Sequence, residues 1–204
     1  MTGIHQFVPT FEPGAVGAHM LQVRRVVREM GFDSEIFAEH RRWPGVTDVE
    51  EYRRYGRAFA AGAGDVLLYQ TAIGSVVADF VLDRPETLAV NYHNITPVGF
   101  FAQWEPDVVH GVAWGRAQLA AMGERAVLGI ADSGYNEQEL IALHYRRTTV
   151  AGALLSSRRP PPPKVSGTAV EAYATTGRRW CMASSRGTQK PSWSLTQTKT
   201  SAAR

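Results

Sequence analysis

Short apolar runs alternate with longer amphipathic stretches between Ile4 and Leu155. The runs have the length of buried strands, and the stretches between them repeat their apolar residues every three to four positions, as helices do. This alternation is typical of βαβ units, in which the strands lie parallel and helices cover the sheet. We therefore predict an α/β fold: a single Rossmann-like domain with a parallel β-sheet flanked by helices. The predicted strands are IHQFVPTF, DSEIFAE, DVLLYQ, TLAVNYHNI, AVLGIADS and TTVAGALL.

Several residues mark the ends of the predicted helices. The helix AHMLQVRRVVREM should stop at Gly31, and Ser75 is placed to cap VVADFVLD. Asn136, with Glu139 three positions later, resembles a capping box. A further helix is predicted over residues 46–62, where two glutamates precede two arginines at helical spacing.

The composition changes abruptly after Leu155. Residues 1–155, here called the body, hold 13 Arg, no Lys and 18 acidic residues, a net charge of −5. Residues 156–204, the tail, hold six Arg, three Lys and one acidic residue, a net charge of +8. The tail also has four consecutive prolines and 15 Ser or Thr. Because it offers little apolar surface to offset the entropy of ordering, we predict a folded domain over 1–155 and a disordered tail over 156–204.

The tail has two other interpretations. It could be a proline-rich ligand for a partner protein, or a basic segment for an anionic surface. All the lysines and the single cysteine, Cys181, lie in it, while the body uses arginine alone. This switch in residue usage suggests the hypothesis that the tail derives from a shifted reading frame or a fusion.

Several classes of function are disfavoured by the composition. One cysteine allows no disulfide or cysteine-based metal site within the chain, and the histidines lack metal-ligand spacing, so no metal site is expected. The net negative body lacks the basic character of a nucleic-acid-binding domain. No signal peptide and no apolar run of about 18 residues is present, which predicts a cytoplasmic protein.

The segment NYHNITP places His93 at the carboxyl end of a predicted strand. Open α/β sheets bind their ligands at this edge, where a histidine can serve as a general base, an orienting donor or a phosphate contact. The alternative is a histidine hydrogen-bonded within a turn, with Asn94 closing an Asx turn before Pro97. Asp132 and Ser133 also follow a strand, where they could contact a ligand or cap the next helix.

The loop EPGAVGAH joins the first predicted strand to the first helix and contains Gly14 and Gly17. Glycines there let the backbone approach a ligand, and the helix N-terminus attracts anions. The spacing is GxxG, so neither a dinucleotide fingerprint nor a P-loop is present. The alternative is a tight turn that requires glycine.

Taken in order, several segments resemble the N-terminal domain of family 4 glycosyltransferases, which have the two-domain GT-B fold. The similarity covers about Ile4–Leu155. The segments are IHQFVPTFEPGAVGAHMLQVRRVVREMG, DVLLYQTAIGS, LAVNYHNITP, GRAQL, IADSGYNEQEL and TTVAGALL.

The resemblance implies a function and a set of site residues. In such enzymes the N-terminal domain holds the acceptor, the C-terminal domain holds the nucleotide-sugar donor, and transfer occurs in the cleft between them, usually without a metal ion. The resemblance makes His93 the catalytic residue that faces the transferred sugar and helps to stabilise the transition state. It makes Gly14, Gly17 and Asn94 substrate-binding residues. No cofactor is implied beyond the nucleotide-sugar, the donor substrate of the complete enzyme.

The chain departs from the family pattern in several places. His144 stands where the family usually has a helix-ending glycine, and Ala151 and Gly152 stand where it has a proline soon after the last strand. The tail contains no E-x7-E motif of the kind that grips the donor and is too short for a second Rossmann-like domain.

We therefore expect a truncated acceptor-side domain that is inactive alone. The expected partner is a saccharide or lipid-linked acceptor, and the expected location is the cytoplasm or the inner face of the membrane as a peripheral protein. The alternative is a non-catalytic α/β binding or interaction module with a partner-recruiting tail.

Overall fold

The computed structural model describes residues 2–101 and 105–154, and in this part seven parallel strands form one sheet in the order β3-β2-β1-β4-β5-β6-β7. The strands are β1 (Ile4–Phe11), β2 (Ile36–Arg41), β3 (Glu50–Glu51), β4 (Val66–Thr71), β5 (Thr87–Tyr92), β6 (Leu128–Ala131) and β7 (Thr148–Val150). The helices are α1 (Ala15–Glu29), α2 (Val76–Leu82), α3 (Pro106–Arg125) and α4 (Gly134–Ala142), with 3-10 turns η1 (Tyr52–Arg54) and η2 (Val98–Phe100). The predicted α/β fold is confirmed; the predicted disorder of 156–204 lies outside the described residues.

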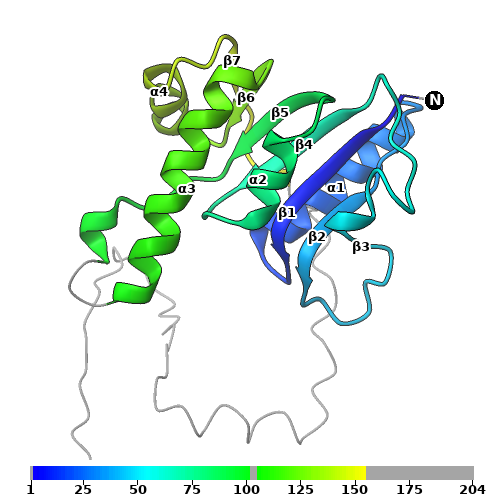
Figure 1. Ribbon diagram of the computed structural model, residues 1–204, viewed down its shortest axis with the longest axis horizontal. Helices are drawn as coiled ribbons and strands as arrows, with labels where there is room; N and C mark the ends of the chain where they lie inside the picture. The colour runs from blue at the N-terminus through cyan, green and yellow to red at the C-terminus, as the bar shows by residue number, and fades with distance from the viewer. Residues whose placement is uncertain (1, 102–104, 155–204) are drawn as a thin grey trace, which may run out of the picture. The chain divides into compact units, whose positions relative to one another are not determined.

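Helices cover the sheet on both faces. Figure 1 shows α2 and α3 in front of the strands and α1 behind them. Alternate strand residues divide accordingly, because successive side chains of a strand point to opposite faces. Phe7 and Tyr69 belong to the large apolar cluster that includes α2 and α3, whereas Val8 packs with Met20 of α1. Burying each such side chain contributes about 1.5–3 kcal/mol, so both clusters stabilise the domain.

The strand order reverses between β1 and β4. In open α/β sheets this switch point opens a crevice at the edge where the strands end, here called the carboxyl edge. The Gly14 loop follows β1 and His93 follows β5, so both belong to this edge. The fold therefore brings together two segments that lie far apart in the sequence.

The helix predicted over 46–62 is wrong. Glu50–Glu51 pair with β2 as the short strand β3, and η1 follows. Tyr52 and Tyr55 are buried in the large apolar cluster, and Gly56 has a φ of 75°. Aromatic burial and strand pairing thus override the local helical charge pattern, since propensity is weaker than tertiary packing.

Two predicted helix ends are confirmed and one is wrong. Gly31 follows α1 with a φ of 89°, and the Ser75 hydroxyl accepts a hydrogen bond from the Ala78 amide at 3.2 Å. The cap of α4 is Ser133, whose hydroxyl accepts from the Asn136 amide at 3.3 Å. Asn136 is instead buried and donates its side-chain amide to the Tyr92 carbonyl at 3.4 Å.

His144 has the left-handed backbone conformation that glycine usually adopts after a helix. Its φ is 61°, directly after the last residues of α4, and its side chain is exposed. Because this left-handed conformation costs an L-residue about 1 kcal/mol, we expect His144→Gly to stabilise the domain by about 0.5–1 kcal/mol. Urea unfolding would measure the gain, with His144→Ala as the control that keeps a Cβ. Equal stability of the two variants would contradict this explanation.

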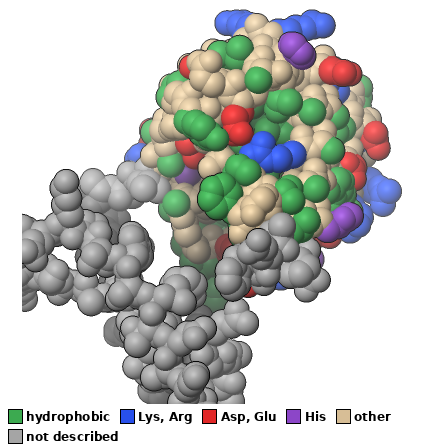
Figure 2. All heavy atoms as spheres, turned by 90° about the vertical axis from the view of Figure 1, so that its left-hand side faces the viewer, with side chains coloured by type: hydrophobic (Ala, Val, Ile, Leu, Met, Phe, Trp, Pro, Cys, Tyr) green, Lys and Arg blue, Asp and Glu red, His purple; other side chains and the backbone are tan. Residues whose placement is uncertain are grey.

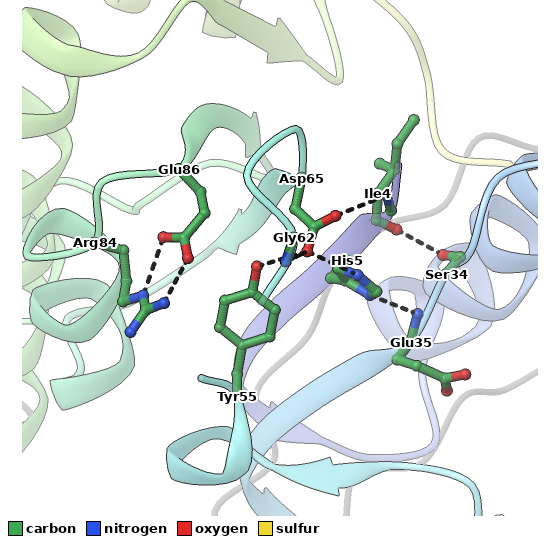
Figure 3. Close-up of polar contacts among 10 residues, drawn as sticks. Ile4, His5, Ser34, Glu35, Tyr55, Gly62, Asp65, Arg84 and Glu86 are labelled. Carbon is green, nitrogen blue, oxygen red and sulfur yellow. Dashed lines mark hydrogen bonds and ion pairs between the residues drawn. The ribbon is translucent and has the colours of Figure 1, made fainter. Parts of the chain in front are cut away.

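The buried carboxylate of Asp65 joins several segments at the edge of the sheet where the strands begin, here called the amino edge. Asp65 precedes β4, accepts from the Gly3 amide at 2.8 Å and the Gly62 amide at 2.7 Å, and accepts from the Tyr55 hydroxyl at 3.0 Å. The His5 ring lies 3.6 Å from the same carboxylate, as Figure 3 shows. Burial alone would raise the pKa of Asp65, but these hydrogen bonds and His5 lower it. We call these five residues the amino-edge cluster.

The surface of the body carries charged side chains of both signs, as its composition predicts. Figure 2 shows hydrophobic, acidic and basic side chains interspersed on the face that carries α3 and α4. None of the described helices combines the length and the apolar character that crossing a membrane requires.

Candidate functional site at the carboxyl edge

The imidazole of His93 lies inside the domain. Only 4 % of the side chain is exposed, although the backbone around it reaches the surface. Its Nδ1 lies 2.8 Å from Oδ2 of Asp132, and its Nε2 lies 2.7 Å from Oε1 of Gln70. Both ring nitrogens are therefore engaged by neighbouring strand ends.

A chain of amide side chains fixes which atom of Gln70 faces His93. Gln6 donates its Nε2 to the Met20 carbonyl at 2.9 Å, and a carbonyl can only accept. The remaining Oε1 of Gln6 accepts from Nε2 of Gln70 at 2.9 Å, which leaves the Gln70 oxygen toward His93. Both ring nitrogens of His93 therefore face oxygen acceptors. This argues against the general-base alternative, which needs a nitrogen free to take a proton from a substrate.

Two further buried side chains complete this network. Asn91 donates its Nδ2 to Oε1 of Gln70 at 3.0 Å, and the same nitrogen lies 2.9 Å from Nε2 of His19 on α1. The His19 ring packs edge-on against the His93 ring at 5.5 Å, and its Nδ1 accepts from the Leu154 amide at 2.8 Å. The network thus connects α1, β1, β4, β5 and the segments that follow β6 and β7.

Two oxygens of the network have no hydrogen-bond partner among the described residues. They are Oδ1 of Asn91 and Oδ1 of Asp132, and both atoms are buried. Buried oxygens of this kind usually accept a hydrogen bond, so these two are exceptions to the otherwise paired network. Asp132 is 25 % exposed, so this side of the network reaches the surface.

Asn94 is an exposed residue of the turn that follows β5. Its φ of 78° is in the left-handed region, and its side chain is exposed next to the buried His93. Asparagine tolerates this conformation better than most residues, and its amide can both donate to and accept from hydroxyl groups. Of the residues predicted from the turn, Asn94 is the one positioned to contact a ligand directly.

The two predicted glycines differ in their surroundings. A Cβ at Gly17 would lie 2.3 Å from the carbonyl oxygen of Glu12 and 3.0 Å from the Trp43 ring, so close packing explains this glycine. A Cβ at Gly14 would meet nothing within 4 Å, and its φ of 162° is extended backbone. Gly14 therefore lies in open space at the start of α1, whose first turn carries no acidic residue and no side-chain cap.

Alanine substitution should separate the two glycines. Gly17→Ala is expected to destabilise the domain by about 1–3 kcal/mol, because the new methyl group collides with a backbone oxygen. Gly14→Ala is expected to change the unfolding free energy by less than about 0.5 kcal/mol. Chemical denaturation of both variants measures the difference, and equal losses would show that Gly14 also has a packing role.

Sequence reasoning missed most of this network. His93 and Asp132 were identified as candidates, but Gln6, Gln70 and Asn91 were treated only as parts of strands. The available signal was a single amide residue in each of three largely apolar strands. The structure also brings Arg116 of α3 next to this site. Its side chain contacts Glu139 and the backbone of the His93 turn.

Comparisons with known proteins give no further assignment. A scan against protein-family models matched none of them, and a search of curated proteins found no significant relative. Among the described residues, no three His, Cys, Asp or Glu side chains gather closely enough to hold a metal ion.

Acid should destabilise the domain through its buried histidines. Burial lowers the pKa of His5 despite the nearby Asp65, and burial together with His93 lowers the pKa of His19. As pH falls below about 6.5, the unfolded chain binds protons at these positions before the folded chain does, so the unfolding free energy should decrease. Urea titrations between about pH 7.5 and 5.5 measure this slope, with the exposed histidine variants His40→Gln and His110→Gln as controls that keep it. Constant or rising stability on acidification would contradict the prediction.

Proposed function

We propose that the body is the acceptor-side domain of a glycosyltransferase that moves a sugar from a nucleotide-sugar to a saccharide or lipid-linked acceptor. The proposal is supported mainly by one observation. The first turns of α1 lie against the His93 turn at the carboxyl edge, with His19 and His93 in ring contact at 5.5 Å. This placement agrees with the resemblance of the ordered sequence segments to family 4 glycosyltransferases.

The start of α1 supplies the anion-binding part of the proposed site. In sugar transfer an acceptor hydroxyl attacks the anomeric carbon, the bond to the nucleoside diphosphate breaks, and negative charge develops on the leaving phosphate. A helix N-terminus with free amide groups stabilises such charge. Gly14 leaves open space there, and the first turn of α1 has no acidic residue that would repel a phosphate.

The His93 turn supplies the sugar-facing part of the proposed site. Asn94 is exposed and can exchange hydrogen bonds with sugar hydroxyl groups. In this proposal His93 acts through its fixed position between Asp132 and Gln70, which sets the shape and polarity of the wall beside the sugar.

Saccharide binding to the purified 204-residue chain tests the proposal. Saturation-transfer NMR with methyl glycosides of common hexoses, alone and with UDP-glucose or GDP-mannose, should detect weak binding without transfer. Asn94→Ala should remove the saccharide signal, and Gln138→Ala, an exposed substitution on α4, should keep it. Absence of binding to every saccharide and nucleotide-sugar would count against the proposal, and measurable transfer would refute the acceptor-side assignment.

A second candidate function is a non-catalytic α/β binding module. The observation that favours it is the engagement of both His93 nitrogens, together with the 4 % exposure of the side chain. In this case a partner should depend on the tail. Affinity capture would be run with the full chain and with residues 1–155. Unchanged capture of a partner after removal of 156–204 would argue against this second function.

A further inference from the structure

We propose that Arg116 and Glu139 are positioning residues that hold the turn after β5, so that Asn94 is presented in one geometry. They act from the face of the sheet opposite α1. The purpose of this arrangement rests on the proposed function, since Asn94 is the predicted ligand contact. The contacts themselves and their test do not depend on any ligand.

Both backbone groups of Ile95 are held. Arg116 contacts the carbonyl directly, and Glu139 acts on the amide through the Tyr92 hydroxyl. Arg116 of α3 donates its Nη2 to the Ile95 carbonyl, and the Tyr92 hydroxyl accepts from the Ile95 amide at 3.1 Å. Glu139 of α4 accepts from the Tyr92 hydroxyl at 2.5 Å and from both terminal nitrogens of Arg116 at 3.3 Å. The carboxylate therefore joins the two groups that hold the turn.

The hydrogen bonds of Tyr92 have a consistent direction. A phenol has one proton, which here goes to Glu139 at 2.5 Å rather than to Oδ1 of Asn94 at 3.4 Å, and its oxygen remains free to accept from Ile95. Burial and the hydrogen bond to Glu139 raise the pKa of Tyr92 to about 12, so the hydroxyl keeps this proton at neutral pH. Tyr92 is fully buried and Ile95 is 1 % exposed, whereas the side chains of Arg116 and Glu139 are 32 % and 22 % exposed, so these two reach the buried pair from the surface.

The turn is held from two sides. Consecutive strand residues point to opposite faces, so Tyr92 reaches Glu139 of α4 while His93 reaches Gln70 and Asp132. Between these anchors Asn94 adopts its left-handed φ of 78° with an exposed side chain. Such a conformation costs an L-residue free energy and persists when surrounding contacts impose it. Arg116 and Glu139 supply these contacts on one side.

Amide hydrogen exchange on the nitrogen-15-labelled full chain tests the proposal. The Ile95 amide, bonded to the Tyr92 hydroxyl, reports on these contacts. The His93 amide, bonded to the Thr71 carbonyl at 3.0 Å, is an internal reference two residues away. We expect Glu139→Ala and Arg116→Ala to accelerate Ile95 exchange roughly tenfold while the His93 amide changes by less than about twofold. The side-chain amide signals of Asn94 should shift or broaden in both variants.

Two further variants separate positioning from general stability. Glu139→Gln keeps an acceptor for the Tyr92 hydroxyl and should restore most of the Ile95 protection and the Asn94 signals. Gln138→Ala, exposed on the same helix, should leave both unchanged. Unchanged Ile95 exchange in the alanine variants, or an equal acceleration of all amides, would overturn the proposal. Failure to bind saccharides would count against the proposed function but would leave this exchange pattern as expected.

Discussion

Replacing Gly115 with alanine is expected to destabilise the domain by about 2–3 kcal/mol. A Cβ at this position of α3 would lie 2.5 Å from the amide nitrogen of Gly74 and 2.8 Å from the carbonyl carbon of Ile73. Both are backbone atoms of the segment between β4 and α2, and the Gly74 amide donates to the Gly111 carbonyl at 3.0 Å. The loop and helix would have to separate to admit the methyl group.

Gly111→Ala on the same helix is the matched control. Its Cβ would meet only the end of the Ile73 side chain, at 3.1 Å, which can move. Since alanine is the better helix former by about 1 kcal/mol, this variant should be neutral or slightly stabilised. Urea unfolding of both variants measures the difference. Similar losses in the two would mean that helix packing in general, rather than the contact with Gly74, determines the cost.

Replacing Asp65 with alanine is expected to cost about 3–5 kcal/mol of unfolding free energy. The substitution removes the acceptor for the Gly3 and Gly62 amides and for the Tyr55 hydroxyl, and all of these contacts lie at the amino edge (Figure 3). A buried donor left without a partner costs about 1–3 kcal/mol, so the losses accumulate.

The controls for Asp65 distinguish local pairing from net charge. Asp33→Ala removes an exposed carboxylate near the same edge and should change stability by less than about 0.5 kcal/mol. Asp65→Asn keeps one acceptor oxygen, so its loss of unfolding free energy should lie between those of Asp65→Ala and Asp33→Ala. Because its pKa is lowered, Asp65 contributes stability above about pH 3.9 and loses it as pH falls toward the folded-state pKa. If the unfolding free energy of Asp65→Ala decreased with falling pH as steeply as that of the unsubstituted chain, this account would be contradicted.

The sequence predicted most of the sheet because its apolar runs are bounded by clear turn signals. The strand predicted as IHQFVPTF coincides with β1, and the helix stop at Gly31 is correct. Residues 46–62 were misread because their charge spacing is helical, while the decisive factor was burial of Tyr52 and Tyr55 against distant strands. Local patterns do not report such long-range contacts.

The site was predicted only in part for a similar reason. His93 could be placed at a strand end from the sequence alone, since the parallel arrangement follows from the alternation of elements. Its partners Gln70 and Asp132 depend on strand order and register, which bring β4, β5 and β6 side by side. The engagement of both imidazole nitrogens therefore could not be foreseen, and it shifts the proposed ligand contact toward Asn94.

The most direct test of the proposed function is to locate saccharide binding by amide chemical-shift mapping. Methyl hexosides and UDP-glucose would be titrated separately into the labelled 204-residue chain. The proposal predicts that the largest shifts occur at Gly14, His93 and Asn94, with no response at the amino-edge cluster around Asp65. Absence of shifts at these carboxyl-edge residues with every probe, or shifts concentrated at the amino-edge cluster, would contradict it.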